Sequence, residues 1–415
     1  MHSLGAKRSA AARALVEHVR RRGKLLISDT TLRDGEQMPG VSFLPEEKVV
    51  LAEALEKAGI HSIDAGFAAS SDSDFEALRL IAAAAGNMVV MSLSRALQSD
   101  IDAAARALAS RAPNARGISI FLGTSPTHRQ YKLRKSPDDI VRMIEDSVAY
   151  AAERFRIVAF APEDASRTEL DFLCRCYDAA ISAGATTIAF PDTVGILTPK
   201  SAAAFVRSIR ERVTLLDRAL LAVHFHNDLG LAVANSLAAV AEGADIVQCT
   251  LGGLGERAGN AALEEVALAL HLHREEFGRE SPVHLEQLTE LCLLASRLSG
   301  IAPPPTKPVY GANIFATEAG VHQDGILKNA DTYLPYPPEI VGRRDPVRVA
   351  IGKHTGLSGL TYRLELLGIT LDEISTNLLL SRIKKMRRPA DADDDETLRA
   401  LAHEIGLTCA AKGEK

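Results

Sequence analysis

Apolar and polar positions follow two alternating patterns between about residue 25 and residue 273. Short apolar runs rich in β-branched residues are typical of buried strands. Between them, apolar residues recur every three or four positions, which indicates helices packed on one side. The predicted strands lie at residues 25–31, 61–67, 88–93, 117–122, 156–161, 186–190, 221–226 and 245–249. The predicted helices lie at residues 45–57, 74–84, 100–109, 137–153, 170–183, 199–212 and 231–242, with another ending near residue 273.

This strict alternation of strand and helix predicts a parallel sheet, because each helix returns the chain to the same edge of the sheet. Eight strand–helix units in roughly 250 residues have the size of a closed (β/α)8 barrel, or TIM barrel, an α/β fold. That is the fold class we predict. A doubly wound open sheet is the alternative.

The pattern changes after residue 275. A predicted helix at 285–299 precedes the proline-rich segment 302–305, which indicates a stiff linker. Further helices are predicted at 378–386 and 394–405. We therefore expect four parts: an N-terminal basic helix or extension at 1–23, the barrel at 24–300, a linker and subdomain at 301–360, and a helical subdomain at 361–415.

The seventh predicted strand carries the most informative polar residues. His224 and His226 lie two positions apart, so on a strand both imidazoles face the same side. A helix would turn them about 200° apart. Gly230 then precedes a predicted helix, so the histidines lie at the carboxyl end of a strand, where barrel active sites are found. Two structural histidines at a strand end are the alternative interpretation.

Two further polar residues follow the first and eighth predicted strands. Asp34 and Asn260 lie near His224 and His226 if the barrel closes strand eight against strand one. Two imidazoles, a carboxylate and an amide oxygen, without thiolate, suit a divalent cation: Zn²⁺, Mn²⁺ or Mg²⁺. A cation there would polarise a carbonyl group of a substrate.

Four more residues are candidates for catalysis or binding. Arg33 adjoins a predicted ligand and is placed to stabilise an oxyanion, or to form a structural salt bridge. Glu163, at the end of the fifth strand, is interpreted as a group that orients or deprotonates a substrate, or as an arginine-paired carboxylate. Thr193 is a candidate hydrogen-bond partner for a substrate carboxylate. His322, in a glycine-bounded segment outside the barrel, is a candidate general base or a surface histidine.

Composition excludes several classes of function. Apolar residues make up 47% of the chain, charged residues 24%, and the net charge is −5, so we expect no nucleic-acid or membrane partner. Neither a membrane-spanning apolar run nor a secretory signal is found. The five cysteines form no CxxC pair and are interpreted as reduced thiols in a cytoplasmic protein. The basic segment 7–24 is expected to form a surface helix. The glycine-rich segment 252–260 matches no phosphate-binding motif, and its glycines are interpreted as allowing the backbone to approach a ligand.

Six motifs resemble the 2-isopropylmalate synthase and homocitrate synthase family. They are DTTLRDGEQ (29–37), EDASR (163–167), PDTVG (191–195), HFHNDLGLA (224–232), GERAGNA (255–261) and GVHQDG (320–325). The similarity extends from about residue 25 to residue 360. The resemblance implies a TIM barrel, a linker and small helical subdomains. It also implies condensation of acetyl-CoA with a 2-oxo acid, followed by thioester hydrolysis that releases CoA.

The resemblance also assigns roles. It implies that Asp34, His224 and His226 bind a divalent metal, with Asn260 as a fourth ligand. Arg33 would stabilise the developing oxyanion. Glu163 and His322 would serve the acid/base steps, with His322 reaching the barrel of the neighbouring subunit in a homodimer. Thr193 would contact the 2-oxo acid.

The 2-oxo acid itself stays open. The histidine motif and the TSPTH segment (124–128) are more similar to 2-isopropylmalate synthases, whereas the short tail is more similar to compact homocitrate synthases. Ala159 occupies a position where lysine-pathway homocitrate synthases have arginine, and Ala161 replaces a small hydroxyl residue. Phosphono- or phosphinopyruvate is a third option, with Arg95, His128 and Arg129 as candidates to bind an anionic tail.

Two further expectations complete the prediction. The regulatory domain of long 2-isopropylmalate synthases has no counterpart in the sequence, so we expect no leucine feedback through it. A hydroxyacyl-CoA lyase on the same metal barrel is the rival activity. The intact candidate ligands argue against a non-catalytic paralogue.

Overall fold

The computed structural model describes residues 16–17, 19–20, 23–344 and 347–413. The chain divides into two compact units, Met1–Pro303 and Pro304–Lys415, each of which is described by itself below. Most of the basic segment 7–24 lies outside the described residues.

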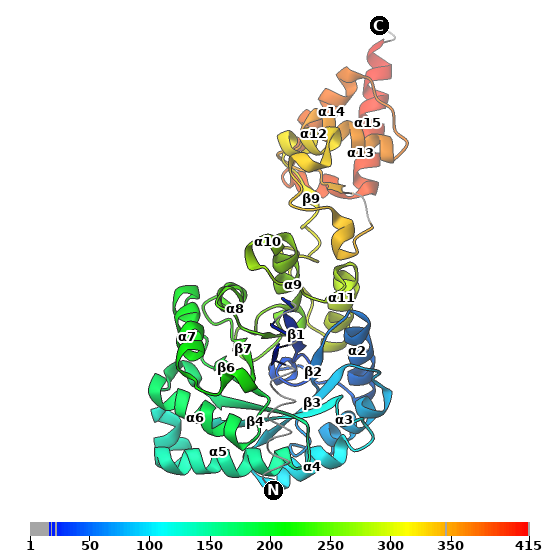
Figure 1. Cartoon of the computed structure of the whole chain (residues 1–415). Coiled ribbons are helices and arrows are strands. Elements are labelled where there is room, and N and C mark those ends of the chain that lie inside the picture. Colours follow the sequence, from blue (N-terminus) through cyan, green and yellow to red (C-terminus); the bar gives the residue numbers. More distant parts are fainter. Residues whose placement is uncertain (1–15, 18, 21–22, 345–346, 414–415) are drawn as a thin grey trace. The chain divides into compact units, whose positions relative to one another are not determined.

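The first unit contains a closed barrel of eight parallel strands, each paired with its neighbours in chain order (Figure 1). The strands are β1 (Leu26–Asp29), β2 (Ser62–Asp64), β3 (Val89–Arg95), β4 (Arg116–Gly123), β5 (Ile157–Glu163), β6 (Thr187–Asp192), β7 (Leu220–Phe225) and β8 (Ile246–Cys249). Pairing of β1 with β8 closes the barrel. The predicted (β/α)8 fold is therefore confirmed, and the open-sheet alternative is wrong.

Helices connect the strands and surround the barrel (Figure 1). They are α2 (Pro45–Lys57), α3 (Asp72–Ala84), α4 (Gln98–Ala107), α5 (Pro137–Ala152), α6 (Leu170–Ala183), α7 (Pro199–Arg212), α8 (Ala232–Ala241) and α9 (Leu263–Leu272), followed by α10 (Arg274–Phe277) and α11 (Leu288–Ser299). Short 3-10 turns lie at η1 (Gly35–Gln37), η3 (Ala165–Arg167), η4 (Leu216–Arg218), η5 (Leu251–Gly253) and η6 (Leu285–Gln287). A π-helical turn, η2 (His128–Leu133), follows β4.

Two predicted elements differ from the structure for local reasons. The strand predicted at 61–67 stops at Asp64, because Gly66 adopts a φ of 145° that leaves the pleated conformation. The helix predicted at 285–299 is a 3-10 turn followed by α11.

An apolar cluster lies at the amino ends of the strands. Its buried members are Val16, Val19, Leu26, Ala189, Leu220, Ala222 and Ile246. Val16 and Val19 are only 3% and 4% exposed, so this part of the predicted surface helix is instead packed against the barrel. Arg20 adds an ion pair to the buried carboxylate of Asp245, at 2.8 Å.

The second unit has its own core. Strands β9 (Ala316–Thr317) and β10 (Arg348–Val349) pair in parallel. The helices are α12 (Gly320–Lys328), α13 (Leu357–Leu366), α14 (Glu373–Lys385) and α15 (Asp395–Gly413), with 3-10 turns η7 (Ala330–Thr332), η8 (Pro338–Val341) and η9 (Pro389–Asp393). The buried cluster consists of Ile351, Leu360, Leu364, Leu379, Ile383, Ala392, Leu398 and Ala402. The predicted four-part division of the chain stays a prediction.

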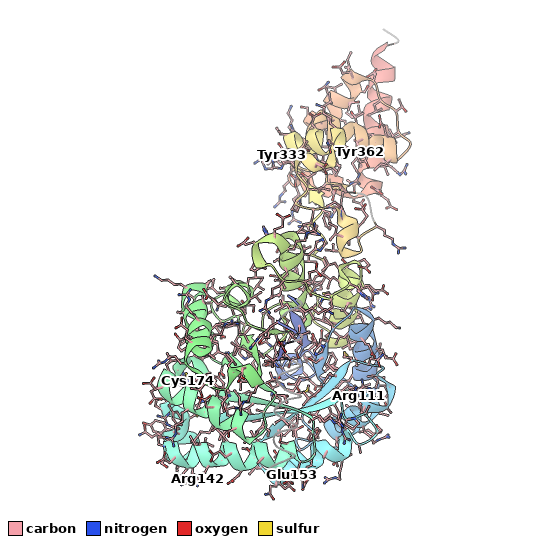
Figure 2. The ribbon with its side chains drawn as sticks, viewed as in Figure 1. Arg111, Arg142, Glu153, Cys174, Tyr333 and Tyr362 are labelled. Atoms are coloured by element: carbon pink, nitrogen blue, oxygen red, sulfur yellow. The ribbon has the colours of Figure 1, made fainter. Side chains whose placement is uncertain are left out.

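Two predictions from composition can be compared with the structure. The cysteines whose side chains are described are buried: Cys174, which is labelled in Figure 2, Cys176, Cys249 and Cys292. Cys174, Cys176 and Cys249 form no disulfide with another described residue. Within the described part of the chain, no helix is both long and apolar enough to cross a membrane.

Candidate active site

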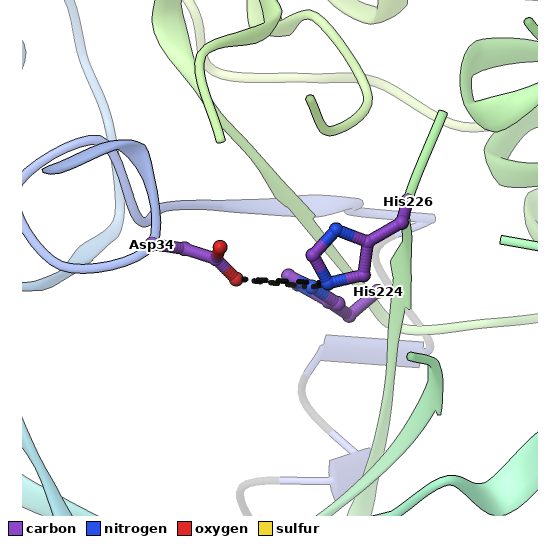
Figure 3. A group of neighbouring side chains, drawn as sticks. All are labelled: Asp34, His224 and His226. Carbon is purple, nitrogen blue, oxygen red and sulfur yellow. Dashed lines mark hydrogen bonds and ion pairs between the residues drawn. The ribbon is translucent and has the colours of Figure 1, made fainter. Parts of the chain in front are cut away.

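Three predicted metal ligands converge at the carboxyl ends of the strands. His224 belongs to β7, His226 follows it directly, and Asp34 lies in the loop after β1. Their ligand atoms all lie within 4.8 Å of one another, and Figure 3 shows the three side chains facing a common point. The two imidazole Nε2 atoms are 3.2 Å apart, and Asp34 Oδ2 lies 3.3 Å from His224 Nε2 and 4.0 Å from His226 Nε2. The structure therefore brings this predicted set together.

The electrostatics of the cluster suit a cation. Burial lowers the pKa of His226 to about 4, and the neighbouring His224 adds to this effect. Burial by itself would raise the pKa of Asp34, but Arg33 and the two histidines outweigh it and hold that pKa well below its usual range. At neutral pH the Asp34 carboxylate is therefore ionised and His226 is neutral, which are the forms that bind a metal.

Asn260 supplies a further oxygen beside this cluster. Its backbone forms a β-bridge with His226, and its amide nitrogen Nδ2 donates to the carbonyl oxygen of Leu254 at 3.2 Å. The other amide atom, Oδ1, is buried without a hydrogen-bond partner among the described residues. Asp34 Oδ1 is likewise buried and has no hydrogen-bond partner among the described residues. Buried polar atoms are normally paired. One such oxygen on Asp34, within the cluster, and another on Asn260, whose backbone is bridged to His226, therefore fit a bound divalent cation.

The glycine-rich segment 252–260 shapes this loop. Gly259 has a φ of +90°, and a Cβ there would collide with the carbonyl oxygen of Gly253. The backbone of the loop therefore packs closely against itself beside Asn260. Approach of this backbone to a ligand stays a prediction.

Arg33 is held between two carboxylates. Its Nε donates to Asp64 Oδ2 at 2.7 Å and its Nη1 to Asp34 Oδ2 at 3.0 Å. Burial would lower the pKa of Arg33, but the two carboxylates outweigh it and raise that pKa. Burial also raises the pKa of Asp64, against the influence of Arg33. The sequence analysis missed Asp64, although its period-two spacing from Ser62 on β2 places it on the inner face.

Glu163 ends β5 beside the π-helical turn η2. Lys132 Nζ lies 2.8 Å from Glu163 Oε1 and 2.6 Å from Oε2, and His128 Nδ1 lies 3.4 Å from Oε2. The cation that pairs with Glu163 is thus a lysine, where the alternative interpretation expected an arginine. Lys132 was also missed, although its spacing from His128 places both on one side of a helical turn.

The remaining predicted binding residues already have protein partners. Thr193 Oγ1 accepts a hydrogen bond from the backbone nitrogen of Asp164 at 2.9 Å. Arg95 forms a two-pronged ion pair with Asp100, at 2.6 and 3.0 Å.

The last two candidates from the sequence also have partners within their own units. Arg129 pairs in the same two-pronged way with Glu169, at 3.0 and 2.8 Å. His322 lies on α12 in the second unit, where its ring stacks near Tyr333, with ring centroids 4.1 Å apart (Tyr333 is labelled in Figure 2).

Two family models match the chain. The model described as HMGL-like matches residues 24–294, and the model described as homocitrate synthase post-HMGL domain-like matches residues 309–391. A 2-isopropylmalate synthase of Nitrosococcus oceani is 45% identical over 393 residues, covering 94% of this chain and 76% of that protein. One from Pyrococcus furiosus is 44% identical over 363 residues, covering 88% and 72%.

Solved structures resemble the barrel. An HMG-CoA lyase from Bacillus subtilis superposes with a TM-score of 0.58 at 19% identity, covering 69% of this chain and 96% of that one. The carboxyl transferase domain of Rhizobium etli pyruvate carboxylase gives a TM-score of 0.53 at 20% identity, covering 69% and 49%. Likenesses at this level of identity concern the fold alone.

Proposed function

The chain belongs to the family of 2-isopropylmalate synthases and homocitrate synthases, and from that premise we propose that it condenses acetyl-CoA with a 2-oxo acid. In this reaction the acetyl methyl group loses a proton and forms a carbon–carbon bond to the keto carbon. The keto oxygen becomes a hydroxyl group, and water then hydrolyses the thioester and releases CoA. The observation that carries the proposal is the buried cluster of Asp34, His224 and His226 in a chain 45% identical to 2-isopropylmalate synthases.

The metal ligands in this proposal are Asp34, His224, His226 and Asn260. A divalent cation held by them would supply Lewis acidity at the keto oxygen. The unpartnered Oδ1 atoms of Asp34 and Asn260 support this assignment. Nitrogen and oxygen ligands are compatible with Zn²⁺, Mn²⁺ and Mg²⁺ alike.

The other roles follow from charge and position. Arg33 stabilises negative charge that develops on the keto oxygen, because its guanidinium is fixed by Asp34 and Asp64. Glu163 orients or deprotonates substrate groups, with Lys132 holding its carboxylate. Thr193 contacts the 2-oxo acid, and we keep Arg95 and His128 as candidate binding residues for the alternative, an acid with an anionic tail.

Among 2-oxo acids, we propose one with a branched apolar tail such as 2-oxoisovalerate. Phe121 on β4 pairs in register with Ala161 on β5, and Ala161 shares a strand face with Glu163 because the two are two positions apart. Ala159 lies on the same face. Arg95, which pairs in register with Phe121, is neutralised by Asp100. The apolar side chains of Ala159 and Ala161, together with the pairing of Arg95 with Asp100, favour a substrate with an uncharged tail over 2-oxoglutarate with its distal carboxylate.

The test is CoA release from acetyl-CoA, measured with and without EDTA. The panel of acids is 2-oxoisovalerate, 2-oxoglutarate, pyruvate, oxaloacetate and phosphonopyruvate. We expect metal-dependent release with 2-oxoisovalerate. Release with another acid would correct the substrate. Silence across the panel from a metal-loaded protein would contradict the synthase activity and direct attention to hydroxyacyl-CoA cleavage.

We further propose a cytoplasmic homodimer in which His322 is the general base for the neighbouring subunit's site. The Asp34→Asn and His322→Ala variants should each be inactive. If His322 acts across subunits, mixing the two should restore part of the activity, because some mixed dimers then hold one intact site. No recovery, with subunit exchange verified by native mass spectrometry, would place His322 in its own subunit's site.

A further inference from the structure

We propose that Thr31 is a positioning residue that aligns the candidate cation ligands by tying the loop after β1 to the loop after β8. The first loop carries Arg33 and Asp34, and the second carries Asn260. This inference rests on the proposed metal site and adds to it a residue that touches neither cation nor substrate.

The side chain of Thr31 is fully buried and makes two hydrogen bonds through one oxygen atom. Its hydroxyl donates to Asp29 Oδ2 at 2.8 Å and accepts from the backbone nitrogen of Leu251 at 2.8 Å. The backbone nitrogen of Thr31 also donates to Asp29 Oδ1, at 2.9 Å. One hydroxyl group thus joins residues 220 positions apart in the chain.

From Leu251 the connection continues to the predicted fourth ligand. The backbone nitrogen of Leu254 donates to the carbonyl oxygen of Leu251 at 3.2 Å. The carbonyl oxygen of Leu254 then accepts from Asn260 Nδ2 at 3.2 Å and from the hydroxyl of Thr250 at 2.6 Å. Because this carbonyl accepts the amide N–H of Asn260, it determines that Oδ1 is the atom left for a cation.

On the other side, Thr31 lies within the turn that positions Asp34. The carbonyl oxygen of Thr30 accepts from the backbone nitrogens of Arg33 and Asp34, at 3.2 and 2.9 Å. The next residue, Gly35, packs between the two loops: a Cβ there would lie 3.4 Å both from Leu254 Cβ and from Thr31 Cγ2. A shift of Thr31 therefore moves Asp34 and Asn260 relative to each other.

The test compares two substitutions at this one position. Thr31→Val keeps the shape of the side chain and removes the hydroxyl, whereas Thr31→Ser keeps the hydroxyl and removes the methyl. Ser147→Ala is the matched control, because it removes a buried hydroxyl whose hydrogen bonds to described residues stay within α5, to the carbonyl oxygens of Met143 and Ile144. Mn²⁺ is titrated into each metal-free protein, and free Mn²⁺ is counted by electron paramagnetic resonance, without substrates.

We expect Thr31→Val to weaken Mn²⁺ binding by about 10- to 100-fold, the usual effect of losing a group that orients metal ligands. Thr31→Ser and Ser147→Ala should bind as the wild type does. Hydrogen exchange measured by mass spectrometry should also speed up at residues 251–260 in Thr31→Val. Should Val prevent folding, Thr31→Ala removes the same hydroxyl from a smaller side chain and is compared with Thr31→Ser in the same way.

Two results would overturn the inference: unchanged Mn²⁺ affinity in Thr31→Val despite a lowered melting temperature, or equal weakening in Thr31→Val and Thr31→Ser. The first would leave Thr31 a stabilising residue only, and the second would assign the effect to packing of the methyl group. Asp34→Asn and His224→Ala separate this from failure of the metal site. If they bind Mn²⁺ as the wild type does, the proposed site itself is wrong; if they lose it while Thr31→Val does not, only the inference is.

Discussion

Arg33 has two interpretations, one as a structural salt bridge and one as a catalytic residue. The sequence predicted a salt bridge or an oxyanion partner. The salt bridges are present, and the bonds to Asp34 and Asp64 hold the guanidinium in one orientation, as the proposed oxyanion role requires. Lysine keeps the charge but has no planar fork to bond both carboxylates in this way. We therefore expect Arg33→Lys to lower kcat by about 10²- to 10³-fold with a nearly unchanged KM for acetyl-CoA.

Steady-state kinetics check this prediction, with Mn²⁺ binding as the control that the ligand cluster persists. Arg33→Ala is a poorer test, because it leaves buried Asp64 without its cation. An unchanged kcat in Arg33→Lys would reduce Arg33 to a structural ion pair.

Asp29 gives a prediction about pH. Burial raises its pKa to about 7, against the two hydrogen bonds from Thr31. The folded protein therefore holds a proton at Asp29 that the unfolded chain releases near pH 4. The stabilisation from this group is complete below that pH and is lost as pH rises through 7. Asparagine cannot ionise, so the stability of the wild type relative to Asp29→Asn should fall on the order of 1 kcal/mol per pH unit between pH 5 and 7.

Urea unfolding of both proteins at pH 5, 6, 7 and 8 measures this difference. The comparison cancels the titration of all other groups, which both proteins share. A difference that is constant with pH would mean that Asp29 is already ionised in the folded state at pH 5.

Some residues of the candidate site could be predicted from the sequence, and others could not. His224, His226 and Asp34 were predictable because strand periodicity and barrel closure determine where their side chains meet. Asp64 and Lys132 were missed because nothing in their local pattern is unusual. Their importance comes from the partners that the fold places beside them, Arg33 and Glu163, and such partners depend on three-dimensional contacts.

At the level of elements, helices with strong end signals were predicted best. Helices α2 and α7 begin at Pro45 and Pro199, and α6 ends before Gly184, which has a φ of 119°. Proline at the first position and a left-handed glycine after the last are local signals, so the sequence alone carries them. Strands β9 and β10 have two residues each and are too short to show any periodicity.

The π-helical turn η2 was also not predicted, because its short polar sequence, HRQYKL, shows no regular apolar repeat. It places Lys132 and His128 beside Glu163 at the end of β5. If Lys132 holds the Glu163 carboxylate, Lys132→Met should lower kcat by roughly 10- to 100-fold, the worth of hydrogen bonds to a charged group. Lys132→Arg should retain most of the activity.

Kinetics with saturating substrates test this prediction. Glu163→Gln sets the scale, with an expected loss of about 10²- to 10⁴-fold for an acid/base residue. Arg142→Met is the matched control, since it removes a cation from an exposed pair with Asp139 on α5 and should leave kcat unchanged. Full activity in Lys132→Met would remove Lys132 from the mechanism.

At the level of the whole molecule, closure of the barrel brings motifs that are distant in the sequence together in one candidate site. Asp34 and Asn260 are far apart in the sequence, and the pairing of β1 with β8 brings their loops to the same side of the barrel. Counting eight strand–helix units was enough to predict this closure. The separate core of the second unit was harder to foresee, because its helices are joined by 3-10 turns and loops without a repeating pattern.

Because the chain has two compact units, we expect two thermal unfolding transitions in calorimetry. The candidate cation ligands Asp34, His224, His226 and Asn260 all belong to the first unit, so Mn²⁺ at about 100 times its Kd should stabilise that unit by about 2.7 kcal/mol. Leu379 is fully buried in the second unit, and Leu379→Ala should cost that unit about 2–5 kcal/mol. Differential scanning calorimetry should then show one transition that rises with Mn²⁺ and another that falls with Leu379→Ala. A single transition that responds to both would show that the two units unfold together, because a perturbation confined to one core would then be felt by the whole chain.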